Sequence, residues 1–361
     1  MDRSALFVCF IACTWSLIAS AQSAPPKPID QQLANRALFM AARAGRTDLV
    51  EFSLRNGAQV NARDKKGGNV TALLLASHGG HSDSLAVLLA HGADVDAQDD
   101  AGTNALTLAA SGAHLPSVRE LLKGGAKVNA RQRLSGNTAL MAAAGTVTGY
   151  DVTVELIGAG ASTTQRGYDG YDALMAAASK CRERTLELLM LNGATPKTST
   201  SDGRTALSLA AVDGNPACIQ RLLKAGADVN ASSSDAGSVL AQALVASHTR
   251  AVAALLVGGA DVNGAGRGTQ TPLMLAVRGG DLTLTALLLE AGAQVNTLEA
   301  DTGNTALMLA ANLGHAAIVT LLVQSGADPS IRATDGWTAA QAARMIGEEV
   351  LAKQLEALAE Q

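Results

Sequence analysis

The sequence is poor in the residues that build one large core or a disulfide framework. Aromatic residues make up 2% of the 361 residues, cysteine occurs 4 times and proline 8 times. So few rings argue against a single compact core, whereas 36 glycines are expected where many small units stack. Cys9 and Cys13 lie within the first 13 residues, and the other two, Cys181 and Cys218, do not make a disulfide framework. The composition therefore favours a chain built from many small repeated units.

The sequence also lacks a strong excess of either positive or negative charge. The chain has 28 Lys and Arg against 32 Asp and Glu, a net charge of −4, and the two signs are interleaved along the sequence. Proteins that bind nucleic acid present concentrated positive charge to the phosphates. Nucleic acid is therefore not an expected partner.

Long hydrophobic runs are missing except near the beginning. Arg3 precedes an apolar run over residues 5–19, and Ala19, Ser20 and Ala21 follow as an A-x-A site. A run shorter than the ~20 residues of a membrane-spanning helix, before such a site, is typical of a secretory signal peptide. We therefore expect a signal peptide over 1–21, cleavage after Ala21, and a secreted or periplasmic chain without stable membrane insertion. An uncleaved anchor is the alternative.

A proline-containing linker is predicted over 22–33, and a regular pattern follows it. A Gly-Ala pair recurs every 33 to 35 residues, at Gly57, Gly92, Gly125, Gly160, Gly193, Gly226, Gly259, Gly292 and Gly326. About 21 residues earlier stands a small polar residue: Thr71, Asn104, Thr138, Asp172, Thr205, Ser238, Thr271 and Thr305. Such residues cap helix beginnings, and glycine ends helices in a left-handed backbone conformation. The period therefore predicts an array of similar units, with a helix beginning at each polar residue and a helix ending at each glycine.

These units resemble the ankyrin repeat, whose period is 33 residues and whose first helix opens T-P-L-H-x-A. Thr271, Pro272 and Leu273 match the opening, but no unit carries its histidine. The resemblance covers residues 34–361 in about ten units. It implies an all-α repeat solenoid, an ankyrin array with β-hairpin fingers whose first and last repeats act as caps. We expect Phe39, Phe52 and Trp337 to close the core at the two ends.

The resemblance also implies a function. Ankyrin arrays bind other proteins on the concave face formed by fingers and first helices. We therefore expect a non-catalytic protein–protein interaction scaffold of the cell envelope, with no cofactor. The alternative is a secreted effector or immunity-type inhibitor that binds a foreign or host protein. An enzyme needs an acid, base or nucleophile set outside the repeat pattern, and the sequence offers none.

The fourth unit breaks the regular pattern, and aromatic residues gather beside the break. Its turn between helices is about two residues longer than the others, and Tyr150, Tyr168 and Tyr171 are the only aromatic residues between Phe52 and Trp337. Tyrosine is enriched at binding hot spots. These tyrosines, with Arg166 to pair an acidic group, are therefore candidates for partner binding. The alternative is that the rings pack the distorted loop.

A second candidate is a stripe of apolar residues three positions after the capping residue. It includes Met141 and Met175, and methionine adapts to varied partners. Packing between helix and finger is the alternative.

Histidine residues can form a metal site, and cysteine residues can form a disulfide bridge. His81, His114, His248 and His315 share one slot, which the resemblance assigns to closing the turn between helices, so no metal site is expected. Cys181 and Cys218 occupy unlike slots of different units. We therefore expect two free thiols, with a bridge as the alternative.

Overall fold

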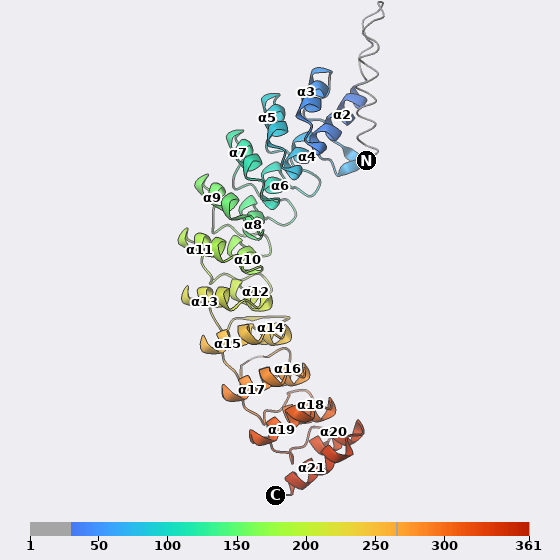
Figure 1. Ribbon diagram of the computed structural model, residues 1–361, viewed down its shortest axis with the longest axis vertical. Helices are drawn as coiled ribbons and strands as arrows, with labels where there is room; N and C mark the ends of the chain where they lie inside the picture. Colours follow the sequence, from blue (N-terminus) through green and yellow to red (C-terminus); the bar gives the residue numbers. More distant parts are fainter. Residues whose placement is uncertain (1–29, 265, 361) are drawn as a thin grey trace, which may run out of the picture. The chain divides into compact units, whose positions relative to one another are not determined.

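The computed structural model describes residues 30–264 and 266–360, where the helices follow one another in ten pairs (Figure 1). The pairs are α2 (Gln31–Ala44) and α3 (Thr47–Arg55), α4 (Ala72–Gly79) and α5 (Ser82–Ala90), α6 (Ala105–Ser111) and α7 (Leu115–Lys123), α8 (Ala139–Ala144) and α9 (Tyr150–Gly158), α10 (Ala173–Ala178) and α11 (Glu183–Leu191), α12 (Ala206–Asp213) and α13 (Pro216–Lys224), α14 (Val239–Val245) and α15 (Thr249–Val257), α16 (Pro272–Arg278) and α17 (Leu282–Glu290), α18 (Ala306–Asn312) and α19 (Ala316–Gln324), and α20 (Ala339–Met345) and α21 (Glu349–Ala359). The predicted all-α repeat fold is confirmed.

The predicted signal peptide and its cleavage site after Ala21 lie outside the described residues. The predicted linker extends to residue 33, but α2 already begins at Gln31. It begins there because the Asp30 carboxylate accepts a hydrogen bond from the Gln32 backbone N–H at 3.0 Å. In the described part of the chain, no helix is long and apolar enough to cross a membrane.

The capping slot works as the sequence predicts. In nine repeats the side chain of the capping residue accepts a hydrogen bond from the backbone N–H three residues later, at 2.8–3.4 Å. Each such cap stabilises its helix by ~1 kcal/mol. Because the first helices have only six to eight residues in these repeats, the caps fix where each helix begins.

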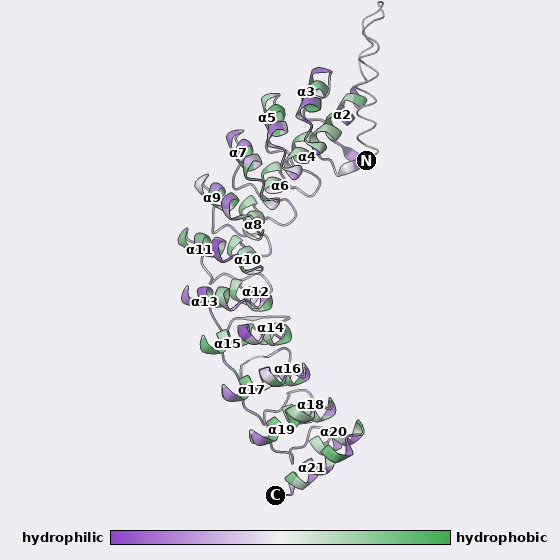
Figure 2. Cartoon of the chain, viewed as in Figure 1, coloured by the Kyte–Doolittle hydropathy of each residue, from purple (hydrophilic) through white to green (hydrophobic). Residues whose placement is uncertain are grey.

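The core consists of small and branched side chains between neighbouring repeats. The helix α4 packs against α2 and α6, and α12 packs against α10 and α14. Ala72 and Ala76 of α4 are fully buried and let the helices approach closely, while Leu73 beside them is 1% exposed. Burying one such leucine contributes roughly 1.5–3 kcal/mol. Figure 2 accordingly shows mainly hydrophobic colours on the first helices.

The fingers between repeats are hairpins with few backbone pairings. The longest is an antiparallel pair of β1 (Ser232–Ser233) and β2 (Gly237–Ser238), in which Ser232 lies opposite Ser238. Other fingers close with one bridge each: Asp64 with Val70, Gln98 with Asn104, Arg166 with Asp172, Ser199 with Thr205, and Arg267 with Gln270. The predicted fingers are therefore present, mostly shorter than a two-stranded ribbon.

The histidines act between repeats rather than within one turn. His81 precedes α5, and its Nε2 lies 3.1 Å from the carbonyl oxygen of Arg43 in the preceding repeat. His248 makes the equivalent contact with the Val212 oxygen at 3.0 Å. The resemblance implied a hydrogen bond that closes the local turn. The structure instead uses these rings to join consecutive repeats.

The expectation of two free thiols is wrong, because Cys181 and Cys218 form a disulfide with a Cα–Cα distance of 5.8 Å. Cys181 lies in the turn after α10, and Cys218 is buried in the first turn of α13 in the next repeat. Each inter-helix turn lies against the beginning of the following repeat's second helix, as the His81 ring against Gly45 also shows. Two different positions of the repeat, the inter-helix turn of one unit and the second helix of the next, therefore lie close together in space.

The irregular fourth repeat coincides with a division of the chain. One compact unit comprises residues 30–143 with Asp151–Ala161, and the other comprises Ala144–Tyr150 with residues 162–360. Five residues, 145–149, separate α8 from α9, whereas two separate α4 from α5. The predicted insertion is thus a longer turn.

The rings at the end repeats do not close the core as expected. Phe52 is 45% exposed and Trp337 is 40% exposed, and Phe39 is half-buried. No further repeat covers these rings in the described residues.

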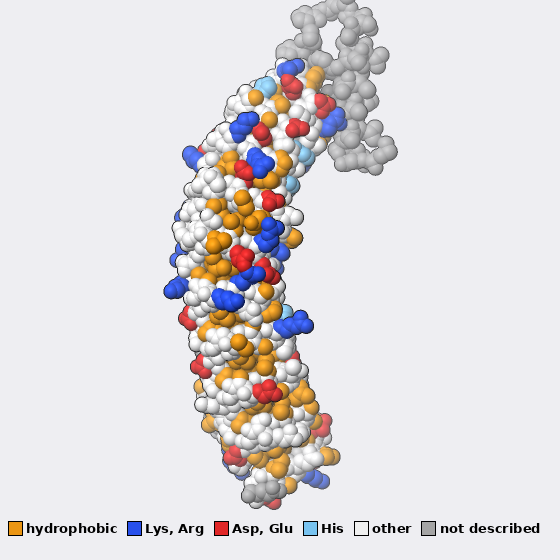
Figure 3. Space-filling view, turned by 60° about the vertical axis from the view of Figure 1, so that its left-hand side comes forward, with side chains coloured by type: hydrophobic (Ala, Val, Ile, Leu, Met, Phe, Trp, Pro, Cys, Tyr) orange, Lys and Arg blue, Asp and Glu red, His pale blue; other side chains and the backbone are white. Residues whose placement is uncertain are grey.

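The surface carries charges of both signs. Basic and acidic side chains lie interspersed, as Figure 3 shows for one face.

Candidate binding site

The finger over residues 165–171, called the tyrosine finger below, is fixed by hydrogen bonds. Gly167 N–H donates to the Tyr171 oxygen at 2.7 Å, and Ser201 N–H of the next finger donates to the Asp169 oxygen at 2.7 Å. Arg166 donates from Nε to the Gly170 oxygen at 3.0 Å and from a terminal nitrogen to the Ser199 oxygen. Arg166 therefore joins two fingers through its guanidinium, which limits its freedom to pair with an acidic partner group.

The two tyrosines of this finger are placed differently. Tyr168 is 62% exposed, so its ring faces solvent from a backbone that is already ordered. Tyr171 is half-buried, and its hydroxyl forms a hydrogen bond with Ser179, the residue after α10. Burial raises the pKa of the Tyr171 hydroxyl, and the bond to Ser179 acts in the opposite direction. Tyr171 thus lies along α10, while Tyr168 is mostly exposed to solvent.

Tyr150 lies on another element. It is the first residue of α9, and the Arg184 guanidinium lies 4.0 Å from its ring centroid. Such a contact contributes roughly 0.5–1 kcal/mol at an exposed site. Nearby, Arg182 Nε donates to the Gly145 oxygen at 3.5 Å, so α11 and its preceding turn hold the long turn of the fourth repeat. Tyr150 therefore has a packing partner on α11.

The methionine stripe is part of the core. Met175 is fully buried and Met141 is 4% exposed. Their equivalents Leu74, Met274 and Met308 are buried as well. A side chain without accessible surface cannot contact a partner on this structure, so Met141 and Met175 are removed from the candidate site. Packing between helix and finger explains the stripe.

Sequence reasoning missed two features here. One is Arg184, which nothing in the sequence marks as a partner of Tyr150 and which only the fold places over that ring. The other is the disulfide, for which a signal existed. Cys181 has a φ of 43° and occupies the turn slot where Gly45, Gly80, Gly214 and Gly280 have positive φ. A cysteine in a glycine slot, with another cysteine one repeat and four residues later, indicates a bridge.

The arrangement suits recognition of a protein surface. The tyrosine finger offers one stiff, exposed ring, backbone groups and flanking polar side chains, which are the elements of a hot spot. Among residues 30–264 and 266–360, no group of three or more His, Cys, Asp or Glu side chains is arranged to hold a metal ion.

Comparison with known families agrees with the repeat geometry. A family model described as ankyrin repeats (3 copies) matches residues 15–99, 38–132, 73–166, 140–233 and 240–333. Together these matches cover most of the chain, and ankyrin repeats indicate a protein–protein interaction scaffold. A search of curated proteins found no significant match.

Proposed function

Because this chain belongs to the ankyrin-repeat family, we propose that it is a secreted scaffold of the cell envelope that holds a protein partner on the tyrosine finger. The observation that carries the proposal is Tyr168, a large ring that is 62% exposed on a finger whose backbone is fixed on both sides. An ordered aromatic side chain loses little entropy on binding, so its burial by a partner yields a large net gain.

Two features support a location outside the cytoplasm. The A-x-A site of Ala19, Ser20 and Ala21 after an apolar run favours export. The disulfide between Cys181 and Cys218 favours the same compartment, because disulfides persist where the environment is oxidising. The first residue of the purified native protein tests this directly. Gln22 in an envelope fraction is expected, and an intact Met1 in the cytoplasm would refute export.

Substitution of Tyr168 tests the binding site. The mature chain is used to capture its partner from the native envelope by crosslinking and mass spectrometry, and the partner is then titrated against variants. Tyr168→Ala should weaken binding by ~2 kcal/mol, about 30-fold, because truncating a hot-spot ring has this effect. Leu298→Ala is the matched control, since Leu298 is a 52% exposed apolar side chain that lies between α17 and α18.

Melting temperatures of both variants must accompany the titration. Tyr168 is exposed, so its removal should leave stability almost unchanged. Equal affinity of the folded Tyr168→Ala chain and the native chain would refute the tyrosine finger as the site. Capture of a foreign or host protein instead of an envelope protein would favour the effector or inhibitor function.

A further inference from the structure

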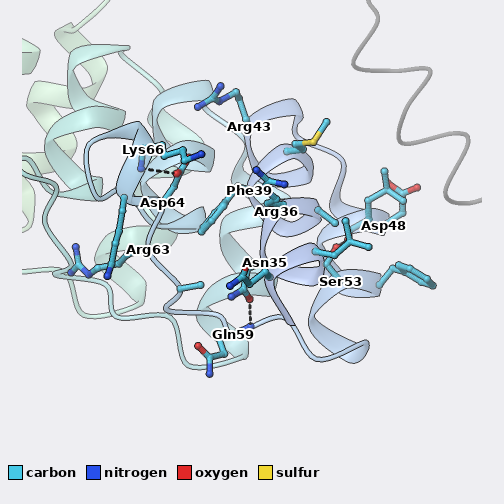
Figure 4. Close-up of a pocket in the computed structure, with 18 residues that line it drawn as sticks. Asn35, Arg36, Phe39, Arg43, Asp48, Ser53, Gln59, Arg63, Asp64 and Lys66 are labelled. Carbon is cyan, nitrogen blue, oxygen red and sulfur yellow. Dashed lines mark hydrogen bonds between the residues drawn. The ribbon is translucent and has the colours of Figure 1, made fainter. Parts of the chain in front are cut away.

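A second surface lies at the first repeat, between α2 and the first finger. A groove of about 1160 Å³ is lined there by residues of α2, α3 and residues 59–66. We call it the first-repeat groove, and its central side chains are Arg36, Phe39, Met40, Arg43, Lys65 and Lys66. Figure 4 shows Phe39 between α2 and the finger that carries Asp64 and Lys66.

The floor of the groove is apolar, and among the described residues no repeat precedes the first one to cover it. Phe39 stands 18 residues before Gly57, as Met175 stands 18 residues before Gly193. Met175 is fully buried, whereas Phe39 is half-buried and lines the groove. Met40 and Phe52 are 37% and 45% exposed beside it. Several apolar side chains are thus available to a ligand at one place.

The rim of the groove is basic. Arg36, Arg43, Lys65 and Lys66 are all exposed, and none of them forms an ion pair with a carboxylate within the described part of the chain. The two acidic groups of the groove are already engaged. Asp48 pairs with Arg46 at 3.0 Å, and Asp64 accepts a hydrogen bond from the Lys66 backbone N–H at 3.1 Å. The groove is therefore positive on a chain of net charge −4.

We propose that the first-repeat groove binds an acidic peptide segment of a protein partner, with one aromatic or branched side chain on Phe39 and carboxylates on the four cations. Positive charge around an exposed apolar floor attracts this chemistry and repels basic segments. The first-repeat groove and the tyrosine finger consist of different residues, so an experiment can refute one proposal and leave the other standing.

Three other occupants fit less well. The chain's own residues 22–29, Gln-Ser-Ala-Pro-Pro-Lys-Pro-Ile, include Lys27 and no acidic residue, so their charge does not complement the rim. The acidic helix α21 of a second copy exposes Val350 and Leu358, but its carboxylates Glu349 and Glu356 are already paired with Arg344 of its own repeat. A flat anionic bilayer would meet the four exposed cations, but Phe39 is half-buried and offers it little apolar surface.

The test uses the full mature chain and a fluorescein-labelled peptide that alternates glutamate with leucine and phenylalanine. Fluorescence anisotropy should show saturable binding that weakens as salt concentration rises, because exposed charges are screened. A second peptide with lysine in place of every glutamate should bind at least tenfold more weakly.

Charge reversal then locates the site. Lys65→Glu with Lys66→Glu should weaken binding of the acidic peptide at least tenfold, and both side chains are exposed, so the fold should persist. The matched control is Lys123→Glu with Lys224→Glu, which changes net charge equally on α7 and α13 and should leave affinity within twofold. Phe39→Leu should weaken binding while preserving an apolar floor.

Each other outcome overturns the proposal. If both charge-reversal variants lose the same affinity for the acidic peptide, the net charge of the chain attracts the peptide and the groove does not bind it specifically. Failure of the acidic peptide to bind the mature chain would mean that the groove is covered or has another ligand. The mature chain could instead co-sediment with phosphatidylglycerol vesicles, through Lys65 and Lys66, and fail to bind the peptide. This result would assign the groove to a membrane surface.

Discussion

The first repeat and the fifth and sixth repeats differ in how they are held. Helices α2 and α3 pack on the second repeat alone in the described chain, and their aromatic side chains remain partly exposed. Helices α10 to α13 pack on one another, α12 also packs on α14, and a disulfide joins the fifth repeat to the sixth. The same sequence slot is therefore core in one repeat and accessible surface in another.

This difference suggests how an array built from one unit acquires distinct sites. A repeat gains most of its stability from its neighbours, so the terminal repeat exposes what the others bury. The first repeat exposes a groove whose four cations form no ion pair with the described residues. The fifth repeat exposes Tyr168 on a finger that its neighbour and Arg166 hold in place.

The largest expected effect is loss of the disulfide. Closing a loop of 37 residues restricts the unfolded chain and stabilises the fold by about 3 to 4 kcal/mol. Urea unfolding should therefore show lower stability in the presence of a reductant. In hydrogen exchange, α10–α13 should lose protection while α2 and α3 stay unchanged.

A reductant-insensitive variant provides the control for this experiment. Cys181→Gly with Cys218→Ala places the usual glycine in the turn and a small apolar residue in α13, so a reductant should not affect it. Identical unfolding midpoints of the native chain with and without reductant would show that the bridge contributes no stability.

A smaller effect is expected at the single junction that holds the first repeat. Gly45 has a φ of 66°, and a Cβ there would meet the His81 ring, whereas Gly57 has a φ of 93° and open space around it. Gly57→Ala should cost about 1 kcal/mol from backbone strain. Gly45→Ala should cost at least about 1 kcal/mol more, because the hydrogen bond between His81 and Arg43 is displaced.

Local hydrogen exchange reports where that loss occurs. Faster exchange is expected in α2 and α3 of the Gly45→Ala chain, with α10–α13 unaffected. If the two alanine variants lose the same stability, the His81 ring is not part of the junction.

The smallest effect concerns a charged finger of the fifth and sixth repeats. Hydrogen bonds from Thr200 and Arg204 hold the pKa of the Asp202 carboxyl below its usual value. A lowered pKa adds stability above the unfolded value of 3.8, and this stability is lost as the pH falls through the folded pKa. Because the pair is partly exposed, we expect less than about 1 kcal/mol.

Asp202→Asn should therefore lower stability slightly at pH 7 and have no effect at pH 2. Titration of Asp202 by NMR gives the pKa directly. A value at or above 3.8 would contradict the predicted contribution.

The sequence predicted the repeat architecture because its determinants are local. Thr71 and its equivalents cap helices through bonds to residues three positions away, and Gly57 and its equivalents end helices through their own backbone preference. The candidate site was predicted only in part. Tyr168 is exposed, as a binding residue must be, but Met141 and Met175 are buried. Sequence periodicity could not predict this burial, because it does not tell which neighbour covers a given position of the repeat.

The sequence by itself determined the period, the caps, the turns and the number of units, since each depends on contacts within a few residues. Only the tertiary structure decided which residues of different repeats meet. It joined Cys181 to Cys218, placed Arg184 on Tyr150 and left Phe39 accessible. These outcomes depend on how one repeat lies against the next, and that geometry arises from packing between residues more than thirty positions apart.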